Sequence, residues 1–186
     1  MRIISGTARG KQLTSFSGNS VRPTPDRVRE ALFSILTSRL GSFSQLNILE
    51  LFAGSGAQAL EALSRGAHSA ILVDSGKTAI DAINENIRRC HFQTQATLIK
   101  EDVYKTLPKL VRFGPFDLIL LDPPYRENHI PQVIEKIESL KLLAKDGIIC
   151  TESAREEVIA DAPTLARIDH RTYGTTQITL YAYPKD

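Results

Sequence analysis

The feature that most constrains the fold is a series of short, largely apolar segments that recur from residue 46 onward. These segments cover residues 47–52, 70–73, 96–99, 116–121 and 147–151. Segments with helical periodicity separate several of them, at 57–65, at 78–89 and around Val133, Ile134 and Ile137. Continuous apolar strands that alternate with helices predict a parallel sheet covered on both faces.

The two ends of the chain add a hairpin and a helix to this pattern. Residues 168–173 and 177–183 flank Gly174-Thr175-Thr176 and predict an antiparallel hairpin. Thr24 as the cap and Pro25 as the first residue predict a helix that ends near Gly41. The sequence therefore predicts an α/β, Rossmann-like fold with a mostly parallel seven-stranded sheet, a C-terminal hairpin and an N-terminal extension. We expect residues 1–44 to form that basic extension, and residues 45–186 to form one compact unit.

Size and cysteine content narrow the class of protein. A chain of 186 residues suits a single domain with one core. No apolar run approaches the roughly 18 residues that span a bilayer, and the first residues do not resemble a signal peptide. Cys90 and Cys150 lack metal-ligand spacing, and we expect buried thiols rather than a disulfide. The expectation is a cytoplasmic monomer with no metal and no membrane partner.

The positive charge of the chain is concentrated near its N-terminus. The formal net charge is +2, but residues 1–40 carry seven basic side chains against Asp26 and Glu30. Such an arm favours contact with a polyanion, and the candidate contacts are Arg9, Lys11, Arg22, Arg27 and Arg29. A helix with a solvated basic face explains the charge equally well.

A glycine-rich turn follows the first predicted strand. Gly54, Gly56 and Ala59 fit the dinucleotide fingerprint, and Asp74 follows about twenty residues later, where a carboxylate can accept ribose hydroxyls. Turns of this kind bind NAD, flavin or S-adenosylmethionine, and some are only tight turns. The turn predicts a cofactor that contains adenosine without choosing among them.

Acidic residues at the strand ends favour S-adenosylmethionine. Glu50 lies within an apolar strand, where a buried carboxylate needs compensation. A sulfonium and an ammonium would supply it, whereas the pyrophosphate of a dinucleotide would be repelled. Asp102 closes the third strand, where it can accept the adenine amino group. Acids that are merely solvated at strand ends are the alternative.

The most specific motif is Asp122-Pro123-Pro124-Tyr125, at the end of the fourth strand. The amine of a nucleobase is a poor nucleophile because its lone pair is delocalised into the ring. The Asp122 carboxylate and the Pro123 carbonyl can each accept one N–H of that amine, and the prolines fix the turn that holds both acceptors. Tyr125 offers a face on which the base can stack. The motif predicts methylation of an exocyclic amine rather than a simple turn.

Taken together, these motifs resemble class I methyltransferases with a DPPY motif. Two N-terminal blocks, residues 2–11 and 22–33, resemble the opening of RsmD-type enzymes, which methylate the N2 amine of a guanine in small-subunit (16S) ribosomal RNA. The resemblance implies a cofactor site for S-adenosylmethionine, residues Asp122 to Tyr125 around the guanine amine, and a basic arm that faces ribosomal RNA within a small-subunit particle. The implied cofactor-lining residues are Glu50, Phe52, Gly54, Ser55, Gly56, Asp74, Ser75, Asp102 and Val103. Ser75-Gly76-Lys77 departs from the bulkier turn expected there.

Three other functions stay open at this point. A DNA adenine-N6 methyltransferase would share the chemistry, but it usually needs a separate target-recognition region. A dinucleotide-dependent oxidoreductase accounts for the glycines and Asp74, but not for Glu50 or the DPPY turn. A non-catalytic RNA-binding module accounts for the basic arm alone.

Overall fold

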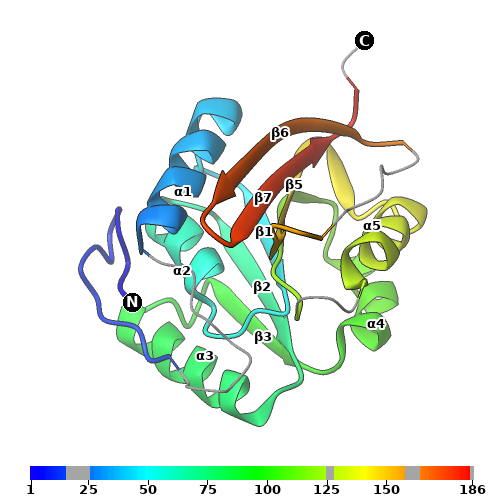
Figure 1. Ribbon diagram of the computed structural model, residues 1–186. Coiled ribbons are helices and arrows are strands. Elements are labelled where there is room, and N and C mark those ends of the chain that lie inside the picture. Colours follow the sequence, from blue (N-terminus) through cyan, green and yellow to red (C-terminus); the bar gives the residue numbers. More distant parts are fainter. Residues whose placement is uncertain (16–25, 125–127, 158–163, 185–186) are drawn as a thin grey trace.

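A computed structural model describes residues 1–15, 26–124, 128–157 and 164–184. Helix α1 (Asp26–Leu40) precedes an alternating series of strands and helices (Figure 1). That series comprises β1 (Asn47–Leu51), α2 (Ala57–Ser64), β2 (Ser69–Asp74), α3 (Lys77–Cys90), β3 (Ala96–Lys100), α4 (Val103–Thr106), the 3-10 helix η1 (Leu107–Arg112), β4 (Phe116–Leu121), α5 (His129–Ser139) and β5 (Leu143–Ala154). Strands β6 (Ala166–Tyr173) and β7 (Thr176–Ala182) form the terminal hairpin.

The sheet has seven strands in the order β3-β2-β1-β4-β5-β7-β6. The strands from β3 to β5 are parallel, and β7 is antiparallel to both β5 and β6. The chain moves outward from β1 to β3 and then returns to place β4 on the other side of β1. This reversal makes the carboxyl ends of β1 and β4 the topological switch point, where open α/β sheets bind ligands.

Helices cover both faces of the sheet (Figure 1). On one face, alternate strand residues such as Ile48, Leu118 and Cys150 pack with apolar residues of α1, α2 and α3. On the opposite face, Leu49 and Ile119 pack with α4, η1 and α5. The period-two alternation of the strands therefore supplies two hydrophobic cores, as expected for a sheet buried on both sides.

The predicted fold is confirmed, with two differences in detail. Strand β5 begins at Leu143, earlier than the predicted residue 147, because Lys145 and Asp146 interrupt the apolar pattern while the backbone stays extended. The short helices α4 and η1 were not predicted, since each spans too few residues to show a helical period. Helix α1 ends beside Gly41, as predicted, and Gly41 has a left-handed conformation with a φ of 75°. Thr24 and Pro25 lie outside the described residues. Cys90 and Cys150 are buried free thiols, as predicted.

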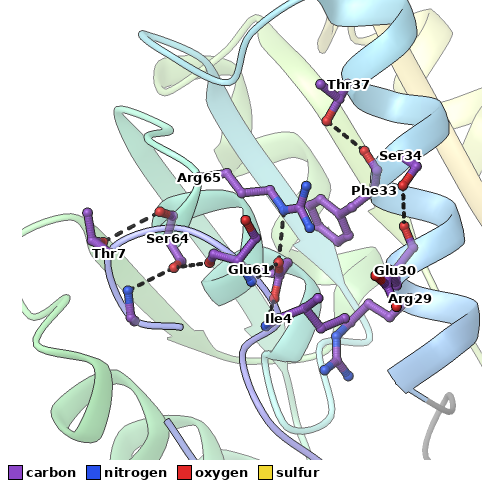
Figure 2. Close-up of polar contacts among 12 residues, drawn as sticks. Ile4, Thr7, Arg29, Glu30, Phe33, Ser34, Thr37, Glu61, Ser64 and Arg65 are labelled. Atoms are coloured by element: carbon purple, nitrogen blue, oxygen red, sulfur yellow. Dashed lines mark hydrogen bonds and ion pairs between the residues drawn. The ribbon is translucent and has the colours of Figure 1, made fainter. Parts of the chain in front are cut away.

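The N-terminal segment is fastened to α2 and α3 rather than extended into solvent. The buried carboxylate of Glu61 in α2 accepts hydrogen bonds from the backbone N–H groups of Ile4, at 2.7 Å, and Ser5, at 3.1 Å (Figure 2). Ser64 bonds to the Ala8 N–H, and Asn86 in α3 pairs with both backbone groups of Thr14. Residues 1–15 therefore form a docked loop that Arg2 and Gln12 close with a bridge.

Candidate cofactor and methyl-acceptor site

The turn between β1 and α2 has the backbone of a ligand-binding loop. Phe52, Gly54 and Gly56 all have positive φ, at 57°, 56° and 73°. Gly56 accepts this conformation freely, whereas Phe52 is held there at a cost of about 1–2 kcal/mol. Such strain is found mainly where the surrounding structure fixes a functional loop.

Glu50 is the buried acid of this loop. Its side chain is 4% exposed, and Oε2 accepts the Ala59 N–H at 3.0 Å in the first turn of α2. Burial raises the pKa of Glu50 to about 8, against the opposing effect of hydrogen bonds from the backbone of Ala59 and Gln58. The neighbouring charge of Asp74 raises this pKa further, and that of Arg29 lowers it. At neutral pH the carboxyl group is therefore mostly protonated, and a bound cation would favour its ionised form.

Asp74 connects the end of β2 to the glycine loop. Its Oδ2 accepts the Gly54 N–H at 2.8 Å, and its Oδ1 accepts the Gly76 N–H at the same distance. The side chain is partly exposed, and Ser75 beside it is exposed. Each carboxylate oxygen has capacity for more than one hydrogen bond, so this arrangement orients Asp74 and still leaves room for a hydroxyl donor.

Asp102 caps the short helix that follows β3. Its Oδ1 accepts the backbone N–H groups of Tyr104 and Lys105, at 3.0 and 3.2 Å. Asp102 is exposed, and Val103 after it is buried. The structure thus gives Asp102 a structural role that the sequence analysis did not include, in addition to the predicted contact with adenine.

Three aromatic rings from separate elements meet beside this loop. His129, the first residue of α5, has its ring centroid 5.3 Å from that of Phe52 and 5.8 Å from that of Tyr104. The Tyr104 hydroxyl lies 2.7 Å from His129 Nδ1. Sequence reasoning found Phe52 but missed Tyr104 and His129, because neither belongs to a recognisable motif.

At the end of β4, Asp122 is partly exposed, Pro123 is buried and Pro124 is exposed. Tyr125 lies outside the described residues. Although the residue as a whole is partly exposed, the carboxyl group of Asp122 is buried, and this burial is the largest factor that raises its pKa well above the usual value. The charges of Glu152 and Glu50 raise this pKa further. Glu152 in β5 is 4% exposed and was not predicted as a site residue. The sequence did hold a signal for Glu152, namely an acidic residue near the end of a buried strand. The same signal identified Glu50.

The predicted RNA-contact residues separate into two groups. Arg9, Lys11 and Arg27 are exposed. Arg29 is 1% exposed, so the prediction that it faces RNA is wrong. It shares one face of α1 with Leu32, Phe33 and Leu36, all buried, and the helix turns that face toward the sheet. Arg22 lies outside the described residues.

A small basic hollow lies beside the docked N-terminal loop. Lys11, Gln12, Arg88, Arg89 and His91 line a cavity of about 380 Å³. Arg89 reaches the Gln12 carbonyl, and both arginines also pair with Glu85. The last turn of α3 thus extends the basic surface of Arg9 and Lys11 in a way that the linear sequence did not indicate.

Comparisons with known proteins assign this architecture to a family. The family model described as "Conserved hypothetical protein 95" matches residues 1–182. The chain belongs to this family. It is the family of RsmD-type proteins, as the N-terminal blocks indicated.

Several relatives in the Conserved hypothetical protein 95 family match nearly the whole chain. The rRNA methyltransferase candidate YlbH of Bacillus subtilis is 34% identical over 97% of this chain and 98% of its own. Ribosomal RNA small subunit methyltransferase D of Escherichia coli K12 is 30% identical, over 100% of this chain and 90% of its own. The solved structure of the Escherichia coli methyltransferase candidate yhhF is also 30% identical, covers 98% and 97% of the two chains, and has a TM-score of 0.84.

Two features are absent from the described residues, namely a metal-binding cluster and a membrane-spanning helix. Among residues 1–15, 26–124, 128–157 and 164–184, no group of three or more His, Cys, Asp or Glu side chains could hold a metal ion. Within the same residues, every helix is too short or too polar to cross a membrane.

Proposed function

We propose that this protein transfers a methyl group from S-adenosylmethionine to the N2 amine of a guanine in small-subunit ribosomal RNA. The observation that carries the proposal is the position of Asp122. Asp122 directly follows β4, which lies beside β1, and the glycine loop after β1 forms the other side of the topological switch point. The names of the Escherichia coli and Haemophilus influenzae relatives, ribosomal RNA small subunit methyltransferase D, support the choice of substrate.

The residues around the glycine loop fit S-adenosylmethionine better than a dinucleotide. Glu50 and Asp74 place two carboxyl groups beside the loop, where they would attract an ammonium or a sulfonium and repel a pyrophosphate. Asp74 would hold the ribose and Asp102 the adenine amino group. The rings of Phe52 and Tyr104 supply flat apolar surface for the adenine. When bound, S-adenosylmethionine supplies an electrophilic methyl group on a cationic sulfur.

Asp122 and Pro123 would orient the acceptor amine. Two hydrogen bonds from that amine, to the Asp122 carboxylate and the Pro123 carbonyl, draw its nitrogen toward tetrahedral geometry and direct its lone pair at the methyl group. The nitrogen gains a methyl group and loses a proton, which Asp122 can accept because its surroundings raise its pKa. Most of the rate enhancement then comes from positioning.

The exposed basic side chains of the N-terminal segment would contact RNA outside the reacting base. Arg9, Lys11 and Arg27 can bind phosphates, together with Arg88 and Arg89 at the end of α3. The target base must leave its stack to reach Asp122, so an unpaired nucleotide of a folded RNA is the least costly substrate. We expect the substrate to be a small-subunit particle that presents such a nucleotide. We expect the protein to act as a monomer.

The deciding experiment is the identification of the methylated nucleoside. The purified protein is incubated with labelled S-adenosylmethionine and with small-subunit particles or naked ribosomal RNA from cells that lack the family enzyme. Nucleosides are then separated and identified by mass spectrometry. N2-methylguanosine at one position supports the proposal, whereas N6-methyladenosine, or transfer only to DNA, would overturn the assignment of the base or of the nucleic acid.

A further inference from the structure

Arg29 is a buried cation whose guanidinium is incompletely bonded. Its side chain is 1% exposed and lies on the inner face of α1. Nη2 donates to the Arg2 carbonyl and, at 3.1 Å, to Asp26 Oδ1. Nε and Nη1 are buried without a hydrogen-bond partner among the described residues. Native structures rarely leave such donors unpaired, because removing them from water costs free energy that only a new partner restores.

The charge of Arg29 is also incompletely balanced. Its salt-bridge partner Asp26 is 41% exposed and lies 3.7 Å from Arg2 as well, so two arginines share this carboxylate. The buried carboxyl group on which the charge of Arg29 acts is Glu50, which is mostly protonated at neutral pH. A buried guanidinium with two unbonded nitrogens, whose one carboxylate partner is shared and partly exposed, is suited to bind an anion.

The position of Arg29 connects it to the cofactor site rather than to the RNA surface. Figure 2 shows the side chain of Arg29 extending from α1 to the neighbourhood of Ile4, where it is buried. Arg29 donates to the Arg2 carbonyl, and the adjacent Met1 sulfur lies 3.9 Å from the hydroxyl of Ser55 in the glycine loop. The charge of Arg29 also lowers the pKa of Glu50, in the strand that leads into this loop. Glu50, Asp74 and Asp122 supply acidic groups around that loop, with Glu152 next to Asp122. These groups suit a cation and would repel a carboxylate.

We propose that Arg29 binds the carboxylate of the methionine moiety of S-adenosylmethionine, while Glu50 faces the ammonium of the same moiety. An amino-acid zwitterion presents both charges a few atoms apart, and Arg29 and Glu50 supply the complementary pair across the same loop. Arg29 thus belongs to the cofactor site, although it lies in the N-terminal block that was attributed to RNA. This inference rests on the proposed cofactor and is independent of which base is methylated.

The test compares two ligands that differ only in the carboxylate. Isothermal titration measures the binding of S-adenosylhomocysteine and of S-adenosyl-3-thiopropylamine, which retains the adenosine, sulfur and amine but lacks the carboxylate. The unmodified protein should bind S-adenosylhomocysteine about 10- to 100-fold more tightly, as expected for hydrogen bonds to a charged group. Equal affinity for the two ligands would overturn the role of Arg29 before any variant is made.

Variants assign this preference to Arg29. In Arg29→Gln the preference should fall to within about threefold, and Arg29→Lys, which keeps the charge, should restore part of it. Arg65→Gln is the matched control, because Arg65 is a guanidinium of 17% exposure that pairs with Glu61 and lies over the ring of Phe33 in α1. It should leave the preference unchanged. A folded Arg29→Gln protein that keeps the full preference would overturn the proposal.

A measurement on the unmodified chain covers the case in which neither Arg29 variant folds. The Nε–H signal of Arg29 in a nitrogen-15 NMR spectrum should shift when S-adenosylhomocysteine binds, and stay unmoved when the decarboxylated ligand binds. A signal that responds identically to both ligands contradicts the assignment. If the unmodified protein binds neither S-adenosylmethionine nor S-adenosylhomocysteine, the proposed function itself fails, which is distinguishable from equal binding of both ligands.

Discussion

Asp122 and Glu152 lie next to each other at two neighbouring parallel strands. Leu121 of β4 pairs with Thr151 of β5, and each acid directly follows its member of this pair. Side chains two positions apart in a strand point to the same face. Leu120 and Cys150, two positions before the acids, pack into the same core, so both acids belong to one face of the sheet. Burial raises the pKa of Asp122 and of the Cys150 thiol, and the charge of Glu152 raises both further. The acid at the end of β4 is therefore one member of an adjacent pair.

Removing the carboxylate of Asp122 should affect the reaction far more than cofactor binding. Asp122→Ala deletes an acceptor that acts mainly on the reacting amine, so turnover should fall by orders of magnitude while the Kd of S-adenosylmethionine stays within a few-fold. Single-turnover methyl transfer and calorimetry measure the two effects. Retention of more than about a tenth of the turnover, a loss below about 1.4 kcal/mol, would contradict the assigned role.

Glu152→Gln should change the pH dependence of methyl transfer. Because the negative charge of Glu152 raises the pKa of Asp122, its removal lowers that pKa, and Asp122 then ionises at lower pH. The acidic limb of the pH–rate profile should move to lower pH. Glu156→Gln, an exposed acid just beyond the same strand, is the matched control and should leave the limb in place. An acidic limb that moves to higher pH, or that moves equally in both variants, contradicts the effect of Glu152 on Asp122.

The affinity for S-adenosylmethionine should rise with pH through the titration of Glu50. The ligand-free pKa of about 8 means that Glu50 must release a proton to face a cation, so tighter binding is expected from pH 6 toward pH 9, by up to about tenfold per unit. Calorimetry in buffers of different ionisation enthalpy should detect this proton release at neutral pH. Glu50→Gln should remove most of the change of affinity with pH. An unchanged pH dependence in this variant would show that another group causes it.

The basic surface of the N-terminal segment should control RNA affinity and its sensitivity to salt. Alanine at Arg9, Lys11 and Arg27 removes three exposed charges, so the KM for RNA should rise and the slope of log K against log salt should decrease by roughly 2–3. The Kd of S-adenosylmethionine should barely change. The control replaces Lys136, Lys145 and Arg112, which are exposed on other elements. An unchanged slope in the first variant would indicate that this surface is only solvated.

Loss of the Glu61 carboxylate should release the N-terminal segment from α2. Glu61→Ala leaves the N–H groups of Ile4 and Ser5 and the Nε–H of Arg65 without their acceptor, so the free energy of unfolding should fall by roughly 2–4 kcal/mol. Limited proteolysis should then cleave within residues 1–15. Glu30→Ala, at an exposed position of α1, serves as the control, and equal stability of the two variants would contradict this anchoring role.

The sequence by itself determined the element types and the position of the loop that bears the site. Apolar runs and helical spacing depend on residues close together in the chain, and they identified the strands, the glycine turn before α2 and the acids Glu50 and Asp74 at strand ends. The Asp-Pro-Pro turn after β4 was identified for the same reason, since its constraint lies within four consecutive residues.

The tertiary structure alone decided which distant residues meet. The order of the strands places β5 beside β4, which brings Glu152 to Asp122. The packing of the helices brings Tyr104 of α4 to His129 of α5. Arg29 was assigned to the RNA surface because its neighbours are basic, yet the rotation of α1 on the sheet buries it. Charge along a chain does not specify which face of a helix turns inward. That choice is made by the apolar residues Leu32, Phe33 and Leu36, which bury their surface against the sheet and α2 and so carry Arg29 inside with them.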